Sequence, residues 1–316
     1  NTSTKNKRLF ITLFSILILA FISNLALGNV MIPFGDVCKI LTTQTHEKST
    51  WIYIVLEYRL PKAFVAILTG IGLSISGLIM QTLFRNPLAG PYVLGLSSGA
   101  SLGVAIVIMG SFLLPNFIAD FLVNDYGILI GAFIGSLLVL LLVFFVASKL
   151  KDTMSILIVG LMFSSLTSAI INILTSFSSA EKLQKFTFWT LGSLGNLNKN
   201  QVILLAVVVS IGLLLSFAII KPLDGLLLGE NYARSLGISI KRTRNISILA
   251  TSILAGTITA FVGPIAFVGL AIPHMSKLIF QSSNHKTLFI ATLFLGAITM
   301  LVCDTISQMP NQDFTI

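Results

Sequence analysis

Charged side chains are scarce in this chain. Only 10% of its 316 residues are Asp, Glu, Lys or Arg, whereas 55% are hydrophobic, and the mean hydropathy is +0.97. A soluble domain carries about 25% charged residues, because its surface must face water. The shortage of charge excludes a soluble globular protein, and no stretch between the apolar runs is long enough to fold as a separate domain.

Several chemical motifs are missing as well. The two cysteines, Cys38 and Cys303, lie far apart and match no paired metal spacing. None of the three histidines stands in an HExxH pattern, and the sequence contains no GxxxxGK[ST] phosphate loop. It also contains no serine–histidine or paired-aspartate arrangement typical of an intramembrane enzyme. We therefore predict no metal, no other cofactor and no enzymatic activity in this chain, so any ATP hydrolysis would need a separate protein.

Long apolar runs are abundant instead. A run of roughly 20 apolar residues suffices to cross a hydrocarbon layer about 30 Å thick. The sequence therefore predicts an all-α, polytopic membrane protein in which residues 1–316 form one transmembrane domain. We expect spans at 9–28, 60–82, 92–114, 127–148, 153–176, 201–220, 245–262, 264–281 and 287–303. The first run could be a signal peptide, but we favour an uncleaved anchor because the later spans must also be threaded through the membrane.

The basic residues predict the orientation. With the N-terminus inside, thirteen of the twenty lysines and arginines fall on inner segments, and eight of the eleven acidic residues fall on outer ones. This bias agrees with the positive-inside rule. The net charge of +9 is thus a signal of topology and does not indicate nucleic-acid binding. Nine spans leave the C-terminus outside, and we expect a tenth span beyond Ile316.

Two stretches rich in proline and glycine interrupt the apolar runs. The first, RNPLAGPYVLGLSSGA at 85–100, lies at the inner surface in this orientation, where its prolines cannot continue a helix. The second, GPIAFVGLAIPH at 263–274, begins at the outer surface and runs inward. A tight helical hairpin with a close-packed neighbour explains the first stretch. The alternative is an inverted repeat of broken helices, as is common along the pathways of transporters.

Small residues recur at helical spacing, and charges inside the spans are nearly absent. Gly127, Gly131 and Gly135 stand four apart, which lets one helix face approach a neighbour closely. A carrier coupled to protons or sodium usually needs an intramembrane acid or base. The candidates are Asp304 at a helix end and His274, which we interpret as a helix-end residue near the inner interface. A secondary carrier is therefore disfavoured.

The longest inner loop, at 221–244, mixes leucines with charges and has glycine breaks at 229 and 237. This pattern predicts one or two short amphipathic helices on the cytoplasmic surface, which present apolar residues to a partner or to the membrane interface. A basic loop that only sets topology is the alternative. It explains the arginines but leaves the leucines unexplained.

These stretches together make the sequence similar to the FecCD family of ABC-transporter permeases, which import iron-siderophores, haem and cobalamin. The matching stretches are RLPKAFVAILTGIGLSISGLIMQTLFRNPLAGPYVLGLSSGAS at 59–101, WTLGSL at 189–194, LLLGENYARSLGISIKRTR at 226–244, GPIAFVGLAIPH at 263–274 and the pair Asp304-Thr305. They cover most of the chain in the expected order, and the block at 59–101 is highly specific.

The resemblance implies a type II ABC importer permease with about ten transmembrane helices per subunit. It further implies a homodimer with a pathway along its axis, and separate cytoplasmic ATPase subunits that dock on the coupling segment 221–244. Carried over by position, the ATPase contact consists of Gly229, Glu230, Ala233, Arg234, Leu236 and Gly237. The resemblance also implies that the two proline and glycine stretches serve as gate or helix-packing elements. The residues concerned are Arg85, Asn86, Pro87, Gly90, Pro91, Gly95, Gly263, Pro264 and Pro273.

On the outer face, the resemblance implies docking of an extracytoplasmic substrate-binding protein. Arg59 and Lys62 occupy two of the family's basic docking positions, whereas Gln308 stands where the cobalamin permease has an arginine. This departure weakens the docking inference on that side and disfavours cobalamin. We expect a permease of the bacterial cytoplasmic membrane that carries an iron chelate, either siderophore or haem, with cobalamin as the alternative.

Overall fold

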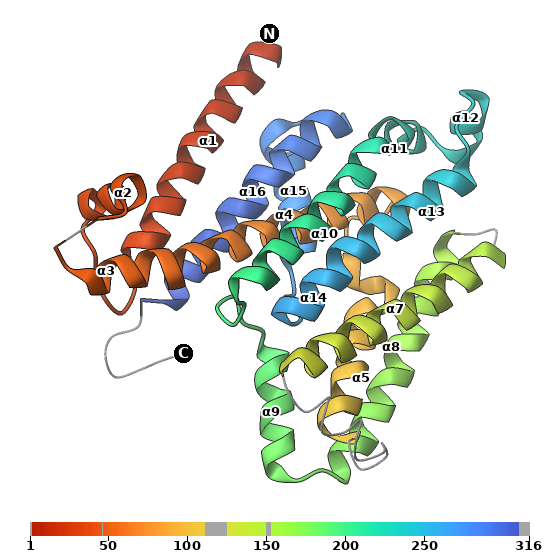
Figure 1. Ribbon diagram of the computed structural model, residues 1–316. Helices are drawn as coiled ribbons and strands as arrows, with labels where there is room; N and C mark the ends of the chain where they lie inside the picture. Colours follow the sequence, from red (N-terminus) through yellow and green to blue (C-terminus); the bar gives the residue numbers. More distant parts are fainter. Residues whose placement is uncertain (1, 46, 111–124, 150–152, 310–316) are drawn as a thin grey trace.

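The computed structural model describes residues 2–45, 47–110, 125–149 and 153–309, and every regular element in these ranges is a helix (Figure 1). This confirms the predicted all-α class. The physical reason is that a helix satisfies its own backbone hydrogen bonds, which lipid cannot do. Together the helices make a membrane-spanning bundle of the kind that the apolar runs predicted.

The N-terminal half of the bundle begins with the long helix α1, and the extended helix made of α3, η1 and α4 follows it. The bounds of these elements are α1 Thr2–Ala26, α2 Phe34–Thr43, α3 Ser49–Tyr53, the π-helical turn η1 Ile54–Arg59, α4 Leu60–Leu83, the 3-10 turn η2 Pro91–Leu94, α5 Leu96–Ile108 and α7 Asp125–Lys149.

The C-terminal half adds five more apolar segments, of which α15 is short, and three shorter helices between them, α9, α11 and α12. Its elements are α8 Thr153–Ser176, α9 Ala180–Leu191, α10 Lys199–Ala218, α11 Ile220–Leu227, α12 Glu230–Ser235, α13 Ile240–Thr251, the π-helical turn η4 Ser252–Gly256, α14 Thr257–Val262, α15 Val268–Phe280 and α16 His285–Ser307.

Each of the nine predicted spans corresponds to a helix. Seven helical stretches are long and apolar enough to cross a membrane, and two shorter apolar helices, α5 and α15, account for the predicted spans at 92–114 and 264–281. Both short helices start four residues later than predicted, because an irregular proline-containing segment precedes each. Residues 111–114 of the first of these spans lie outside the described residues. A helix of 13 residues is only about 20 Å long.

The most buried long helix is α4, which packs against α10, α13, α15 and α16. At its crossing with α16, Gly70 meets the backbone of Gly296, and at its crossing with α15, Gly77 meets the backbone of Gly269. Between α5 and α7, the predicted face formed by Gly131 and Gly135 packs against the backbone of α5. Close backbone approach at small residues is the usual basis of helix association in lipid.

The two ends of the bundle carry different elements. Figure 1 shows the start of α1 together with α11 and α12 at the top, and α9 at the bottom. We call these the coupling end and the α9 end. The N-terminus and the segment 221–244 thus share one end, in agreement with the orientation predicted from the basic residues.

Candidate coupling and translocation sites

The coupling segment 221–244 is built mainly from two short helices and the start of a third. Helix α11 begins directly after α10 and buries Leu223 and Leu226, and α12 buries the methyl group of Ala233. Gly225 has no room for a side chain, because the Ile238 side chain fills the space that a Cβ would take. The segment is therefore a folded unit, as the amphipathic pattern predicted.

Glycine is required at both ends of α12 for a conformational reason. Gly229 has φ of 110° and Gly237 has φ of 79°, and no atom lies within 4 Å of the Cβ that either could carry. After α12, Gly237 N–H donates to Arg234 O and Ile238 N–H donates to Ala233 O, which is a Schellman ending. The prediction that Gly237 terminates a helix is confirmed.

Several apolar side chains of the coupling segment face outward. Leu227, Leu228, Tyr232 and Leu236 are 46–65% exposed, and we call them the exposed apolar patch. Beside them, Glu230 and Arg234 face each other at 3.9 Å with largely exposed side chains, so the pair contributes little stability. A cluster of exposed leucines rimmed by charges is typical of a protein interaction site.

The RNPLAGP turn contacts the coupling segment directly. Arg85 adopts a left-handed conformation with φ of 49°, and its Nη2 donates to Leu226 O at 3.1 Å. The Asn86 side chain accepts a hydrogen bond from Leu88 N–H at 2.9 Å, which closes the turn around Pro87. The turn thus connects the end of α4 to the end of α11.

The two proline and glycine stretches, far apart in sequence, lie against each other. Gly90 borders the Leu270 side chain, and Pro91 lies where a Cβ on Gly269 would be. The Tyr92 hydroxyl accepts a hydrogen bond from Ile265 N–H at 3.4 Å. Irregular backbone at membrane depth is tolerated where protein covers it or where it lines a cavity. The two interrupted stretches thus cover each other's irregular backbone, a contact that the sequence did not predict.

Helix α15 continues through its proline. Pro273 lacks the N–H that would bond to Gly269 O, and this carbonyl instead approaches Gly77 at the crossing with α4. His274 consequently lies in the middle of α15 and is exposed, so the prediction that it ends a helix is wrong.

The remaining predicted packing residues lie next to helix ends. Gly95 has φ of 76° and precedes α5, and Gly263 has φ of 87° and packs on the backbone of Gly192 after α9. Pro264 follows Gly263 in the irregular segment that leads to α15. Both glycines therefore mark points where a helix begins or ends within the bundle.

The Arg59 side chain is buried, with only 4% of its surface exposed. Its guanidinium donates to Leu25 O at 2.8 Å, to Ala26 O at 3.2 Å and to Val30 O at 2.6 Å. These acceptors include the last carbonyls of α1, which have no helical partner and carry partial negative charge. In the isolated chain, Arg59 therefore caps α1.

Lys62 is paired within the chain as well. Its Nζ lies 2.9 Å from Asp304 Oδ1, and the other carboxylate oxygen accepts hydrogen bonds from Asn24 and Gln308. This polar cluster joins α1, α4 and α16. The sequence indicated neither Asn24 nor the pairing, because the partners are separated by more than 200 residues.

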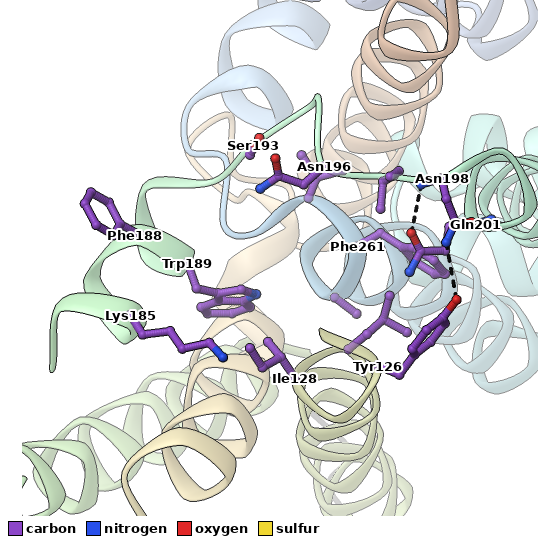
Figure 2. Close-up of a pocket in the computed structure, with 14 residues that line it drawn as sticks. Tyr126, Ile128, Lys185, Phe188, Trp189, Ser193, Asn196, Asn198, Gln201 and Phe261 are labelled. Atoms are coloured by element: carbon purple, nitrogen blue, oxygen red, sulfur yellow. Dashed lines mark hydrogen bonds between the residues drawn. The ribbon is translucent and has the colours of Figure 1, made fainter. Parts of the chain in front are cut away.

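A cavity of about 480 Å³ lies at the α9 end (Figure 2). Figure 2 shows Lys185 and Trp189 extending from α9 towards Ile128 on α7, with Phe261 and Asn198 on the other side. The polar groups at its edge mainly stabilise local structure, since Asn198 caps α10 and also donates to the Tyr126 hydroxyl. The cavity adjoins the WTLGSL stretch that contributed to the resemblance.

Helix α8 presents a polar face to the outside of the chain. Ser165, Ser168, Asn172 and Ser176 are all exposed and are spaced three or four apart, so they share one face. The three serine hydroxyls donate to carbonyls one turn earlier, which satisfies them. Asn172 carries an amide with two donor hydrogens, which lipid cannot accept. This face is therefore poorly suited to a lipid environment.

Comparison with known proteins agrees with this geometry. The sequence matches the profile of the FecCD transport family over residues 16–316. The hemin transport system permease protein HmuU of Yersinia pestis is 33% identical over 84% of this chain and 78% of HmuU. The vitamin B12 import system permease protein BtuC of Citrobacter koseri is 30% identical over 96% of this chain and 87% of BtuC.

The architecture is shared too. A solved metal-chelate type ABC transporter in an inward-facing conformation is similar with a TM-score of 0.83 and 26% identity, over 98% of this chain and 93% of that one. The matched residues include the coupling segment, both interrupted stretches and the outer polar cluster. The chain belongs to the FecCD transport family and is a membrane-spanning permease subunit of an ABC importer.

Proposed function

We propose that the chain forms a homodimer that works with separate ATPase subunits to import a metal chelate across the bacterial cytoplasmic membrane. The observation that carries this proposal is the exposed apolar patch on the coupling segment. A permease needs a surface through which an ATPase can act on it, and Leu228, Tyr232 and Leu236 are exposed at the end of the molecule that the basic residues assign to the cytoplasm. Glu230 and Arg234 supply a polar rim.

The polar face of α8 supports the homodimer. In a single chain surrounded by lipid, Asn172 and the exposed serines would face hydrocarbon. A second copy placed against α8 would enclose these residues and leave a polar path between the two subunits. The hydroxyls already bond to their own helix, so such a path would bind a passing solute only weakly.

An iron chelate, either siderophore or haem, is the proposed cargo, and cobalamin is the alternative. HmuU and BtuC carry names that refer to hemin and to vitamin B12, both of which enclose a metal in a large organic ligand. Among the described residues, no group of three or more His, Cys, Asp and Glu side chains is placed to hold a metal ion. We infer that the permease passes the metal inside its chelator.

The α9 end is the proposed docking face for a substrate-binding protein. Lys62 and Arg59 lie on the outer part of α4 and its π-helical turn, although both are engaged within the chain. An acidic group of a binding protein would therefore compete with Asp304 for Lys62. Arg59 would act mainly by holding α1 in place.

Reconstitution tests the proposal directly. The permease, its ATPase and its binding protein are placed in proteoliposomes, and uptake of ⁵⁵Fe-labelled siderophore, ⁵⁵Fe-haem and ⁵⁷Co-cobalamin is measured with and without ATP. We expect ATP-dependent uptake of one iron chelate. Uptake driven by a proton or sodium gradient without ATP would instead make the chain a secondary carrier.

A further inference from the structure

Helix α11 of the coupling segment is tied to the N-terminus of α16 by one carboxylate. Asp224 Oδ1 accepts a hydrogen bond from the His285 backbone N–H at 2.8 Å and lies 2.7 Å from His285 Nδ1. A negative charge at this position is also favoured by the dipole of a 23-residue helix. Two bonds to one residue fix both the position and the direction of α11 relative to α16.

The same imidazole continues the connection to a third helix. His285 Nε2 lies 2.7 Å from Thr82 Oγ1 on α4. With Nδ1–H of a neutral ring donating to Asp224, Nε2 accepts the single Thr82 hydroxyl hydrogen, which is the alternative to its bond with Leu78 O at 3.0 Å. Only 1% of His285 and 3% of Thr82 is exposed. The Asp224 side chain is 38% exposed, whereas the His285 and Thr82 groups that it leads to are buried, and a buried polar group that loses its partner is costly. We call Asp224, His285 and Thr82 the polar bridge.

A second contact restrains α11 two residues beyond Asp224, close to the C-terminal end of the helix. Arg85, which follows the C-terminal end of α4, donates to Leu226 O at 3.1 Å. Helix α11 also buries Ile220 and Leu223 against the bundle. The short helix therefore cannot shift by itself, since its carboxylate, its C-terminal carbonyl and its apolar face all bind helices that cross the membrane.

The route from the ATPase surface to the spans is accordingly short. Leu227 and Leu228 of the exposed apolar patch follow Asp224 by three and four residues, so they lie one turn further along the same short segment. A force applied to the patch reaches α16 through Asp224 and α4 through His285 and Thr82. Energetic coupling between distant sites is carried by packed and hydrogen-bonded elements that can adopt discrete alternative arrangements.

We propose that the polar bridge positions α4 and α16 relative to the coupling segment and transmits the displacement of α11 to both helices during the transport cycle. The inference rests on the proposed function, because it needs an ATPase acting on the coupling segment. Each member is a positioning residue, since none lies on the proposed cargo path. Loss of the bridge should leave the ATPase bound and hydrolysing ATP, while the spans no longer follow it.

The test uses a reporter that needs no cargo. Cys303 is exposed near the far end of α16, and Cys38 is the second exposed cysteine. In a Cys38→Ser background, a spin label on Cys303 is followed in the permease–ATPase complex in nanodiscs, before and after trapping with ATP and vanadate. ATP hydrolysis and ATPase co-purification are measured on the same samples, together with the thermal stability of the permease.

Paired variants separate transmission from folding. Asp224→Ala removes the acceptor and Thr82→Val removes the hydroxyl, whereas Asp224→Asn and Thr82→Ser keep an oxygen in place. We expect the first pair to reduce the ATP-dependent change in the Cys303 label at least about fivefold, the lower end of couplings between linked sites. The second pair and the exposed neighbour control Lys286→Ala should behave as the unsubstituted complex.

The outcomes are distinguishable. An unchanged label response in Asp224→Ala and Thr82→Val would overturn the inference and leave the proposed function intact. If both variants instead lose thermal stability and ATPase binding in proportion to the label response, the bridge is only structural and the inference is also wrong. A complex without substitutions in the bridge that shows no ATP-dependent response at all would reject the proposed function itself.

Discussion

At the scale of single residues, backbone conformation and buried charge constrain this permease more tightly than side-chain chemistry does. Gly229 and Gly237 are needed because their φ angles are positive, although space around them is open. Arg59 is needed because the end of α1 presents carbonyls that no helix satisfies. Neither requirement concerns cargo, so these positions should be sensitive to substitution whatever the cargo is.

Gly237 offers a test of the conformational argument. An L-residue in the left-handed region costs about 1–2 kcal/mol, and a β-branched residue costs more, whereas asparagine tolerates it. Gly237→Val should therefore displace α12, weaken co-purification of the ATPase and abolish ATP-dependent uptake, while the permease stays folded. Gly237→Asn should retain both activities. Equal activity of the two variants would show that the backbone at this position does not matter for coupling.

At the scale of helices, close crossings decide the arrangement. Gly77 and Gly269 let α4 and α15 approach until backbone touches backbone, and Pro273 releases the carbonyl that lies at this contact. Gly70 and Gly296 do the same for α4 and α16. The interrupted stretches can be irregular because these crossings already fix the helices on either side.

The crossing at Gly77 predicts a large effect from a single methyl group. A Cβ at this position would collide with the backbone of Gly269, which cannot rotate away as a side chain would. Overpacking of this kind costs about 1–3 kcal/mol. Gly77→Ala should lower the thermal stability of the purified permease in detergent. Gly35→Ala in α2, where nothing lies within 4 Å, is the matched control and should leave the stability unchanged or raise it.

The sequence predicted the spans well, because hydropathy over 20 residues dominates in a membrane. It missed α2 and α9, which are short and amphipathic and lie between the apolar runs. It indicated the coupling helices and the glycine that ends α12, since both signals are local. The pairing of Lys62 with Asp304 and of Asp224 with His285 could not be predicted, because such contacts depend on how distant helices pack.

At the scale of the whole molecule, the two ends carry different structural features. The coupling end carries the exposed apolar patch, the Arg85 contact and the polar bridge. The α9 end carries the cavity beside Trp189 and the polar cluster around Asp304. The excess of lysine and arginine on the segments assigned to the inside agrees with this division.

The division predicts that residues at the two ends react from opposite sides of the membrane. In a Cys38→Ser, Cys303→Ser background, a cysteine replaces either Ser235, which is exposed at the end of α12, or Asn196, which is exposed in the loop after α9. A membrane-impermeant maleimide added to intact cells or spheroplasts should label Asn196→Cys only. Ser235→Cys should react after permeabilisation, because the positive-inside bias places the coupling segment in the cytoplasm.

Labelling of both variants from the same side would reject the arrangement of spans between them, and labelling of Ser235→Cys alone in intact cells would invert the whole orientation. Only the predicted pattern allows an ATPase in the cytoplasm to reach the exposed apolar patch.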